Sequence, residues 1–441
     1  MRIAVIGSGA AGAAATAHLR ARGCRVVVLE RDEIGGRAKS IDLGGTRVDV
    51  GAQFLTNFYT ETLTLLRRAH REAALREIPR SIGVAIDDRV HDLLTWRAAL
   101  GSGILPWPAK LAVVPELILA LTRWRTLDVQ ALWRAADLDT GSLEEAYGRS
   151  RGSRVLLDRV VAPAIDNFLY WSPAETSRAL SPALVKGALI LRHMWTLTDG
   201  VGSLPGIFLG DAEVRTGTAV TGVRESGPAV SVTTADGREE RYDGAVIAIP
   251  AAAVGSVWTQ APDRVAELLS GVTYSRTTVL SARLGRRVAA PTNGVMFAGD
   301  GGKPVAAVTV ASRRNAPDLP PGEDVVQIFS TEATAGHWAQ SSDHEILESA
   351  GRMLAGLNGG AFDPRNSIRD LHVQRWDPAL PKFRPGYLAA LRSVQPWLRS
   401  AGRVRIAGDY LSGPFVEGAV TSGIVAARAV LEGIGAGSVN P

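Results

Sequence analysis

Lysine and cysteine are scarce in this chain of 441 residues, and both scarcities limit its chemistry. The lysines are Lys39, Lys110, Lys186, Lys303 and Lys382, so 49 − 5 = 44 of the basic residues are arginine. Any mechanism that needs an ammonium group therefore has five candidates. The single cysteine, Cys24, excludes an intrachain disulfide and any site with several thiolate ligands, and we expect no metal site.

The sequence also lacks an uninterrupted apolar run that could span a bilayer. Its most apolar long stretch, 103–122, contains three prolines, a lysine and a glutamate, whereas a spanning helix needs about 20 mainly apolar residues. The first residues predict a strand and show no secretory signal, so we expect a cytoplasmic protein.

Tryptophan and arginine recur around the same stretch, at Trp96, Arg97, Trp107, Arg123, Trp124, Arg125, Trp133 and Arg134. This pattern predicts a buried helical subdomain. The alternative is a helix that lies in a membrane interface, which would make the protein membrane-associated by peripheral contact.

The overall composition is that of a globular protein, with 46% hydrophobic and 21% charged residues and a net charge of +5. We interpret the arginine excess mainly as coding bias, with recognition of an anion as the alternative. The basic clusters at 67–68 and 149–154 lack interleaved aromatic residues, so we expect no nucleic-acid partner.

A glycine-rich turn between two predicted strands opens the chain. The apolar runs 3–6 and 25–30 predict the strands, and helix-forming residues 13–21 lie between them after the motif Gly7-Ser8-Gly9-Ala10-Ala11-Gly12. This order of strand, glycine turn, helix and strand is typical of a fold that binds an adenine dinucleotide.

Each glycine of such a turn has a physical reason. Gly7 permits the tight turn, Gly9 lets the backbone approach a pyrophosphate, and Gly12 lets helix and sheet pack closely. The free N–H groups at the helix start, around Ala10 and Ala11, favour phosphate. Glu30 follows Gly12 by 18 residues, close to the spacing at which a carboxylate binds a ribose hydroxyl.

The residues after Glu30 indicate that the dinucleotide is FAD and not NAD. They read Glu30-Arg31-Asp32-Glu33-Ile34-Gly35-Gly36-Arg37 and, further on, Asp49-Val50-Gly51-Ala52-Gln53. This segment resembles the amino terminus of the FAD-dependent amine oxidase superfamily, which includes monoamine oxidases, protoporphyrinogen oxidases and phytoene desaturases. The resemblance implies that Arg37 binds the pyrophosphate beside Arg31 and Gly36, and that Gly51, Ala52 and Gln53 pass the isoalloxazine ring.

The carboxyl-terminal end of the chain extends the resemblance. A predicted strand ends at Gly408-Asp409, and a helix opens within Gly413-Pro-Phe-Val-Glu-Gly418-Ala419-Val420. The resemblance implies that Gly408 and Asp409 meet the ribityl and phosphate groups of FAD, and that the helix start at Gly418, Ala419 and Val420 faces the flavin. A helix dipole there would stabilise the anionic reduced flavin. Val220 stands where the family has its adenine-contacting valine.

The predicted fold class is α/β, an FAD-binding Rossmann-like (GR2-type) domain with an inserted α+β substrate domain and a helical subdomain. We expect the FAD-binding domain to be assembled from three separate segments, 1–80, 201–270 and 391–441. A helical segment of the substrate region at 81–200 and a substrate domain of sheet and helices at 271–390 would interrupt it. No second glycine motif follows a strand, so we expect O₂ or another external acceptor in place of a built-in NAD(P)H site.

The scarcity of lysine bears on the reaction. Monoamine oxidases place a lysine on a substrate-domain strand, but the matching run Tyr274–Ser281 has none, and its closest positions are Thr278 and Val279. This absence disfavours amine oxidation, and the chain more closely resembles the protoporphyrinogen oxidase-like branch of the family. We expect hydride transfer to flavin N5 from a hydrophobic, cyclic or conjugated small molecule, which is thereby desaturated.

The candidate catalytic residues are Trp376, Lys382, Tyr387 and Phe415. Tyr387 stands about where covalent members have a cysteine, which implies noncovalent FAD. An apolar pocket for the substrate is expected from aromatic residues, namely Tyr170, Trp171, Trp195, Tyr387 and Phe415.

Three alternatives remain open. A flavin amine oxidase and an FAD-dependent isomerase or cyclase without net redox change would both keep the motifs. A non-enzymatic binder that resembles Rab escort proteins is disfavoured by Glu30, Arg37 and the pair Gly408-Asp409. The oligomeric state stays open.

Overall fold

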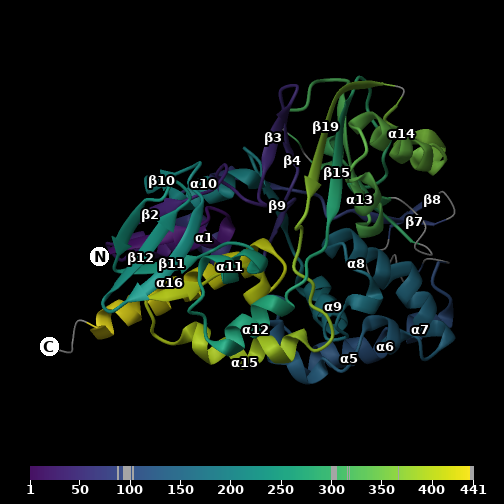
Figure 1. Cartoon of the computed structure of the whole chain (residues 1–441). Coiled ribbons are helices and arrows are strands. Elements are labelled where there is room, and N and C mark those ends of the chain that lie inside the picture. The colour runs from purple at the N-terminus through teal and green to yellow at the C-terminus, as the bar shows by residue number, and fades with distance from the viewer. Residues whose placement is uncertain are drawn as a thin grey trace.

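The computed structural model describes residues 1–86, 89–92, 101, 104–298, 305–314, 316, 318–365 and 367–437. Trp96, Arg97 and Lys303 lie outside the described residues. Two large sheets, one at each end of the molecule, organise the described residues (Figure 1).

The first sheet is parallel throughout and draws on distant segments of the chain. Its order is β10 (Glu213–Arg215), β2 (Arg25–Leu29), β1 (Arg2–Ile6), β14 (Gly244–Ile247) and β20 (Val404–Ile406). After Arg2 and Arg25, which begin β1 and β2, the central strands are apolar and buried because both faces of a parallel sheet are covered. The predicted α/β class is confirmed.

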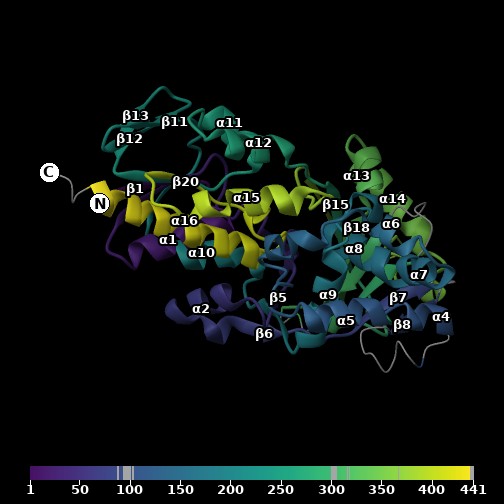
Figure 2. The ribbon, with the colours of Figure 1, turned by 90° about the horizontal axis from the view of Figure 1, so that it is seen from below.

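Two helices from opposite ends of the chain lie side by side on this sheet (Figure 2). They are α1 (Ala10–Arg20) and α16 (Val416–Gly437), and the shorter α10 (Leu204–Leu209) packs beside α1. Their approach is close, because a Cβ at Gly423 of α16 would overlap the carbonyl oxygen of Ala11.

Smaller elements complete this end of the molecule. They are the antiparallel sheet β11 (Val220–Ser226), β12 (Ala229–Thr234) and β13 (Glu239–Tyr242), and the helices α2 (Thr60–Arg68), α11 (Ala251–Val257), α12 (Asp263–Gly271) and α15 (Tyr387–Arg399).

The second sheet has seven strands and is mixed. Its order is β19 (Ile368–Trp376), β15 (Thr277–Leu284), β18 (Asp324–Ser330), β17 (Val305–Val310), β16 (Gly294–Phe297), β7 (Ile82–Ile86) and β8 (Arg89–Asp92), with only the β16–β7 pair parallel among the described strands. Helices α13 (Glu332–Trp338) and α14 (Asp343–Leu354) cover it. The expected helical character of 81–200 is therefore wrong for 82–86 and 89–92, which are strands. The strand partner of 82–86 comes from more than 200 residues further along, which local pattern does not reveal.

Helices fill most of the remaining range up to residue 190. They are α4 (Trp107–Leu111), α5 (Val114–Thr122), α6 (Leu143–Tyr147), α7 (Arg151–Leu156), α8 (Ala162–Leu169) and α9 (Leu180–Ile190). Within this range, η2 (Leu132–Leu138) is a 3₁₀ segment. Short strands β3 (Ser40–Leu43), β4 (Thr46–Asp49), β5 (Leu55–Thr56), β6 (Leu75–Glu77) and β9 (Met194–Leu197) connect the two ends. Every helix among the described residues is too short or too polar to cross a bilayer.

Candidate functional site

A cavity of about 1450 Å³ is lined by residues of both large sheets. Ligand pockets for one small molecule are about 300–1,000 Å³, so this cavity has room for a cofactor and a substrate together. We call the lining from 7–11, 30–37, 51–53 and 408–409 the glycine wall. We call the lining from the second sheet and helix α8, with Tyr170 and Trp376, the sheet wall.

Backbone contacts shape the glycine wall. Gly7 has φ +96°, and a Cβ there would lie 2.6 Å from the carbonyl oxygen of Ala248. A Cβ at Gly12 would overlap the carbonyl oxygen of Gly7, and one at Gly36 (φ +56°) would lie 3.3 Å from the Cα of Gly9. These positions accept only glycine, which leaves the space beside the turn free of side chains.

The start of helix α1 is open toward the cavity. Its N-cap residue is Gly9, no side chain caps its first N–H groups, and its first turn contains no acid. Ala10 and Ala11 line the cavity there. Uncapped N–H groups at the positive end of a helix dipole are the complement of a phosphate.

Glu30 follows the end of β2 and is fixed by backbone and hydroxyl donors. Its Oε2 accepts hydrogen bonds from the Ser8 backbone N–H at 2.8 Å and the Ser8 hydroxyl at 2.7 Å, and its Oε1 accepts one from the Asp32 N–H at 2.9 Å. A carboxylate offers about four acceptor positions, so one remains for a ligand hydroxyl.

Arg37 joins the two terminal segments of the chain. Its Nη1 donates to the carbonyl oxygen of Ala379 at 2.5 Å, and its Nη2 donates to Oδ1 of the buried Asp409 at 2.9 Å. A guanidinium has five N–H donors, so three remain after these two bonds. Two residues that the sequence predicts separately thus form one ion pair on the cavity.

Most residues predicted for the cofactor and substrate line this cavity: Gly7, Gly9, Ala10, Ala11, Glu30, Arg31, Gly36, Arg37, Gly51, Ala52, Gln53, Val220, Trp376, Gly408, Asp409, Phe415 and Ala419. Gly12, Gly418 and Val420 lie behind the lining. A Cβ at Gly418 would overlap the Gly413 carbonyl oxygen, and Val420 is fully buried, so these three contribute close packing.

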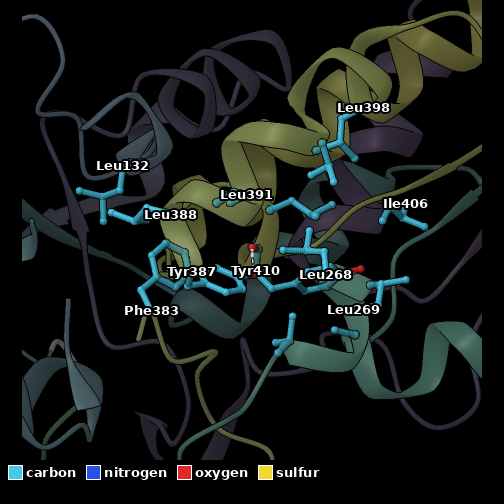
Figure 3. Packing of buried hydrophobic residues seen from close by; sticks show 14 of the residues in the cluster. Leu132, Leu268, Leu269, Phe383, Tyr387, Leu388, Leu391, Leu398, Ile406 and Tyr410 are labelled. Atoms are coloured by element: carbon cyan, nitrogen blue, oxygen red, sulfur yellow. Dashed lines mark hydrogen bonds between the residues drawn. The ribbon is translucent and has the colours of Figure 1, made fainter. Parts of the chain in front are cut away.

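Tyr387 does not face the cavity, which corrects its expected catalytic role. It packs among Phe383, Leu388 and Leu391 in the hydrophobic core (Figure 3). Its hydroxyl donates a 2.6 Å hydrogen bond to the carbonyl oxygen of Tyr410. The ring is therefore a core residue, and the backbone accepts the bond from its phenol.

Lys382 is likewise occupied elsewhere. Its ammonium is buried and lies 2.7 Å from a carboxylate oxygen of both Glu175 and Glu332. Two carboxylates satisfy this charge away from the cavity lining, which corrects the expected catalytic role of Lys382 as well.

Two expected pocket aromatics also lie elsewhere. Trp171 stacks on Phe383 in the core, and Trp195 stacks on His193. Tyr170 lines the cavity as expected, and Phe168 of α8 and Phe329 of β18 are further aromatic residues of the sheet wall.

Trp376 and Phe415 do line the cavity. Trp376 ends β19, and its Nε1 donates to the carbonyl oxygen of Val50 at 2.7 Å, next to the predicted flavin segment 51–53. From β15, Thr277 and Val279 line the cavity. Among the described lining residues the one lysine is Lys39, which belongs to the glycine-wall side and lies 3.6 Å from Glu33.

One lining residue that the sequence does not predict is Arg314, which follows β17 in the 3₁₀ turn 311–314. Its guanidinium lines the cavity and donates to Oε1 of Gln53 at 2.5 Å and to the Gln53 carbonyl oxygen at 2.6 Å. Burial lowers the pKa of Arg314, and the more distant Asp49 opposes this effect. No sequence signal marks it, because its partner is 261 residues away.

Comparison with known proteins defines the class. A sequence model of the family described as flavin containing amine oxidoreductase matches residues 10–431. The chain belongs to this family of flavin-dependent oxidoreductases.

Individual relatives match over short stretches. A stretch of 55 residues is 47% identical to phytoene dehydrogenase from Streptomyces griseus, and one of 66 residues is 36% identical to an uncharacterised protein from Methanothermococcus thermolithotrophicus. These stretches cover 12% and 15% of this chain but only 11% and 65% of the relatives.

Solved structures match over nearly the whole chain. A protein from Exiguobacterium sp. 255-15 assigned as a protoporphyrinogen oxidase has a TM-score of 0.75 at 17% identity, covering 97% of this chain and 98% of that one. Putrescine oxidase bound to putrescine has a TM-score of 0.76 at 16% identity, and the match covers 98% of this chain and 99% of that one. Cyclohexylamine oxidase from Brevibacterium oxydans IH-35A has a TM-score of 0.74 at 20% identity, and the match covers 98% of each chain. At these identities the likeness shows the fold.

Proposed function

We propose that this flavoenzyme dehydrogenates the carbon skeleton of a hydrophobic, cyclic or conjugated small molecule. The observation that carries the proposal is the sheet wall, whose apolar side chains include Val279, Ala307 and Phe329 and whose strand β15 presents no ammonium group. When bound, FAD supplies the acceptor for a hydride from a substrate C–H bond.

The glycine wall would hold FAD in this proposal. The start of α1 and the three free donors of Arg37 fit the pyrophosphate, and Glu30 has one acceptor position left for a ribose hydroxyl. Gly51, Ala52 and Gln53 form the lining next to Trp376. The chain's single cysteine, Cys24, is buried and outside the cavity lining, which supports noncovalent binding.

The sheet wall would orient the substrate. Phe415 and Trp376 offer flat apolar surfaces, and the bond from Trp376 to Val50 fixes the indole ring. A rigid apolar enclosure holds a reacting carbon near its acceptor and excludes water. O₂ or another external acceptor would then take the electrons from the reduced cofactor.

Amine oxidation is the second candidate, because the family includes amine oxidoreductases and putrescine oxidase shares the fold. Arg314 argues against a cationic substrate, since its half-buried guanidinium would repel an ammonium group in the same cavity. The same cation would favour a substrate with a carboxylate at this place.

The test is anaerobic reduction of the purified flavoprotein by porphyrinogens, polyenes, amines and amino acids. We expect a porphyrinogen or polyene to bleach the flavin absorbance fastest and its product to be lighter by two hydrogen atoms. Fastest bleaching by an amine would select the second candidate. Turnover that leaves the flavin oxidised and the mass unchanged would indicate an isomerase or cyclase. A colourless protein that FAD does not reconstitute would overturn all three.

A further inference from the structure

One surface of the helical region exposes large apolar side chains in a row. They are Trp107 and Leu111 of α4, Val114, Ile118 and Leu121 of α5, and Trp124 just after α5; all are between 39% and 73% exposed. We call these six residues the apolar stripe. Leu189 near the end of α9, which packs against α5, is 44% exposed.

The spacing places the stripe on one side of its helices. Successive members are four, three, four, three and three residues apart, as on one face of a helix. The opposite side, with Ala109, Glu116 and Ala120, is buried against the rest of the helical region. The helices therefore carry a second apolar face that the described chain does not cover.

Apolar exposure is concentrated here. Elsewhere in the described residues, the large apolar side chains that are equally exposed are Met1 and Ile34. Single exposed apolar residues are ordinary on a protein surface, whereas a contiguous group marks an interaction site. Figures 1 and 2 both place α5 at the outer edge of the helical region.

The charges around the stripe have one predominant sign. Between residues 104 and 127 the basic residues are Lys110, Arg123 and Arg125, and the single acid, Glu116, is buried 3.7 Å from Arg178. Outside that range, Asp137 pairs with Arg123 at 2.5 Å. The exposed charges of the segment itself are therefore all positive.

A lysine lies over the tryptophan at each end of the stripe. The Lys110 ammonium is 5.2 Å from the ring centre of Trp107, and the Lys186 ammonium of α9 is 5.1 Å from that of Trp124. Tryptophan rings with adjacent cations are typical of the headgroup level of a membrane, where the ring is half in hydrocarbon and the ammonium meets phosphate.

We propose that the apolar stripe docks the protein on the surface of a bilayer that contains anionic phospholipid. The stripe enters the boundary of the acyl chains, and the exposed Arg125 meets the headgroup phosphates. Lys186 donates to the carbonyl oxygens of Trp124 and Leu127, which leaves one of its three N–H groups for a phosphate. A second copy of this chain is the less suitable occupant, because a symmetric interface would place these cations against their own counterparts. This proposal stands independently of the reaction.

The test is flotation of the full-length holoprotein with vesicles. One set contains phosphatidylcholine alone, and the other contains about one part in three phosphatidylglycerol. We expect flotation with the anionic vesicles, reduced by added salt, and at least about tenfold weaker binding to the neutral vesicles.

Matched variants separate apolar insertion from loss of folding. The triple variant Leu111→Gln, Ile118→Gln, Leu121→Gln should lose at least about tenfold in vesicle affinity with its melting temperature unchanged, because these side chains are exposed. The control Leu111→Met, Ile118→Leu, Leu121→Met keeps the apolar surface and should float as the unaltered protein does.

Three results would overturn the proposal. They are the absence of flotation with both kinds of vesicle, equal flotation of the glutamine variant, and a lipid-free dimer that the glutamine substitutions convert to a monomer. The last result would make the stripe an interface between copies.

Discussion

The glycine wall and the sheet wall enclose one cavity but are built in different ways. Backbone atoms shape the glycine wall, so Gly7, Gly12 and Gly36 accept almost no other residue. Side chains from strands and helices far apart in the chain shape the sheet wall, and each can change with little effect on the backbone. We therefore expect cofactor retention and substrate choice to respond to different substitutions.

The largest expected effect follows from Gly12→Ala. The added Cβ would overlap the carbonyl oxygen of Gly7, which forces α1 away from its strand. We expect loss of bound flavin and about 3 kcal/mol less stability, measured by flavin absorbance per protein and by chemical unfolding. Gly206→Ala on α10 is the control, since no atom lies within 4 Å of its added Cβ. Full flavin content in the Gly12 variant would contradict a glycine wall that depends on close backbone packing.

Acid should weaken the glycine-wall end through His18 of α1. Burial, assisted by Arg428, lowers its pKa from 6.5 to about 4. The folded state therefore favours the neutral ring. This stabilisation is complete above pH 6.5, and it is lost as the pH falls toward 4 because the unfolded state takes up the proton first.

We expect this loss to amount to about 2–3 kcal/mol across the interval. His18→Gln removes the titrating group, so the variant should lose that much less stability between pH 6.5 and 4 in parallel unfolding titrations. Identical pH profiles for the two proteins would contradict the assignment of this effect to His18.

Arg37→Met tests the ion pair on the glycine wall. It leaves the buried carboxylate of Asp409 without its partner, and because the Arg37 side chain is 31% exposed we expect a cost of about 2 kcal/mol rather than that of a fully buried pair. Flavin affinity should also fall, as measured by titration of the apoprotein. Arg25→Met removes an exposed pair with Glu213 and should change neither quantity. Unchanged flavin affinity of the Arg37 variant would separate this arginine from the cofactor.

The smallest expected effect belongs to the sheet wall. Trp376→Phe keeps an aromatic ring but removes the hydrogen bond to Val50, worth about 1 kcal/mol. Flavin content should stay constant while the anaerobic rate of flavin reduction falls about fivefold. Trp258→Phe is the control, because the buried Nε1 of Trp258 has no hydrogen-bond partner among the described residues and Trp258 is not part of the cavity lining. A loss of flavin by the Trp376 variant would erase the distinction between the two walls.

The glycine wall can be predicted from the sequence because its constraints act over short distances. The separation of Gly7, Gly9 and Gly12 is fixed by one turn, and Glu30 follows at the end of the next strand. The ion pair between Arg37 and Asp409 is predicted only as two separate contacts, since no local rule links residues 372 positions apart.

The sheet wall cannot be predicted in the same way. Whether Tyr387 faces core or cavity depends on the rotation of α15, and the partners of Lys382, Glu175 and Glu332, come from other regions of the chain. Arg314 reaches the cavity only because β17 ends beside Gln53. That β15 contains no lysine can nevertheless be read from the sequence, because this requires only the location of one strand.

The parallel sheet has a consequence for how the protein is made. Its last strand, β20, and the helix α16 beside α1 come from the final tenth of the chain, as does the Asp409 partner of Arg37. Strands β1 and β2 are therefore synthesised long before their sheet can be completed by β20. We expect FAD to bind only after residues 404–409 have been made, because a chain cut before residue 404 lacks both a strand and an anion of the cofactor pocket.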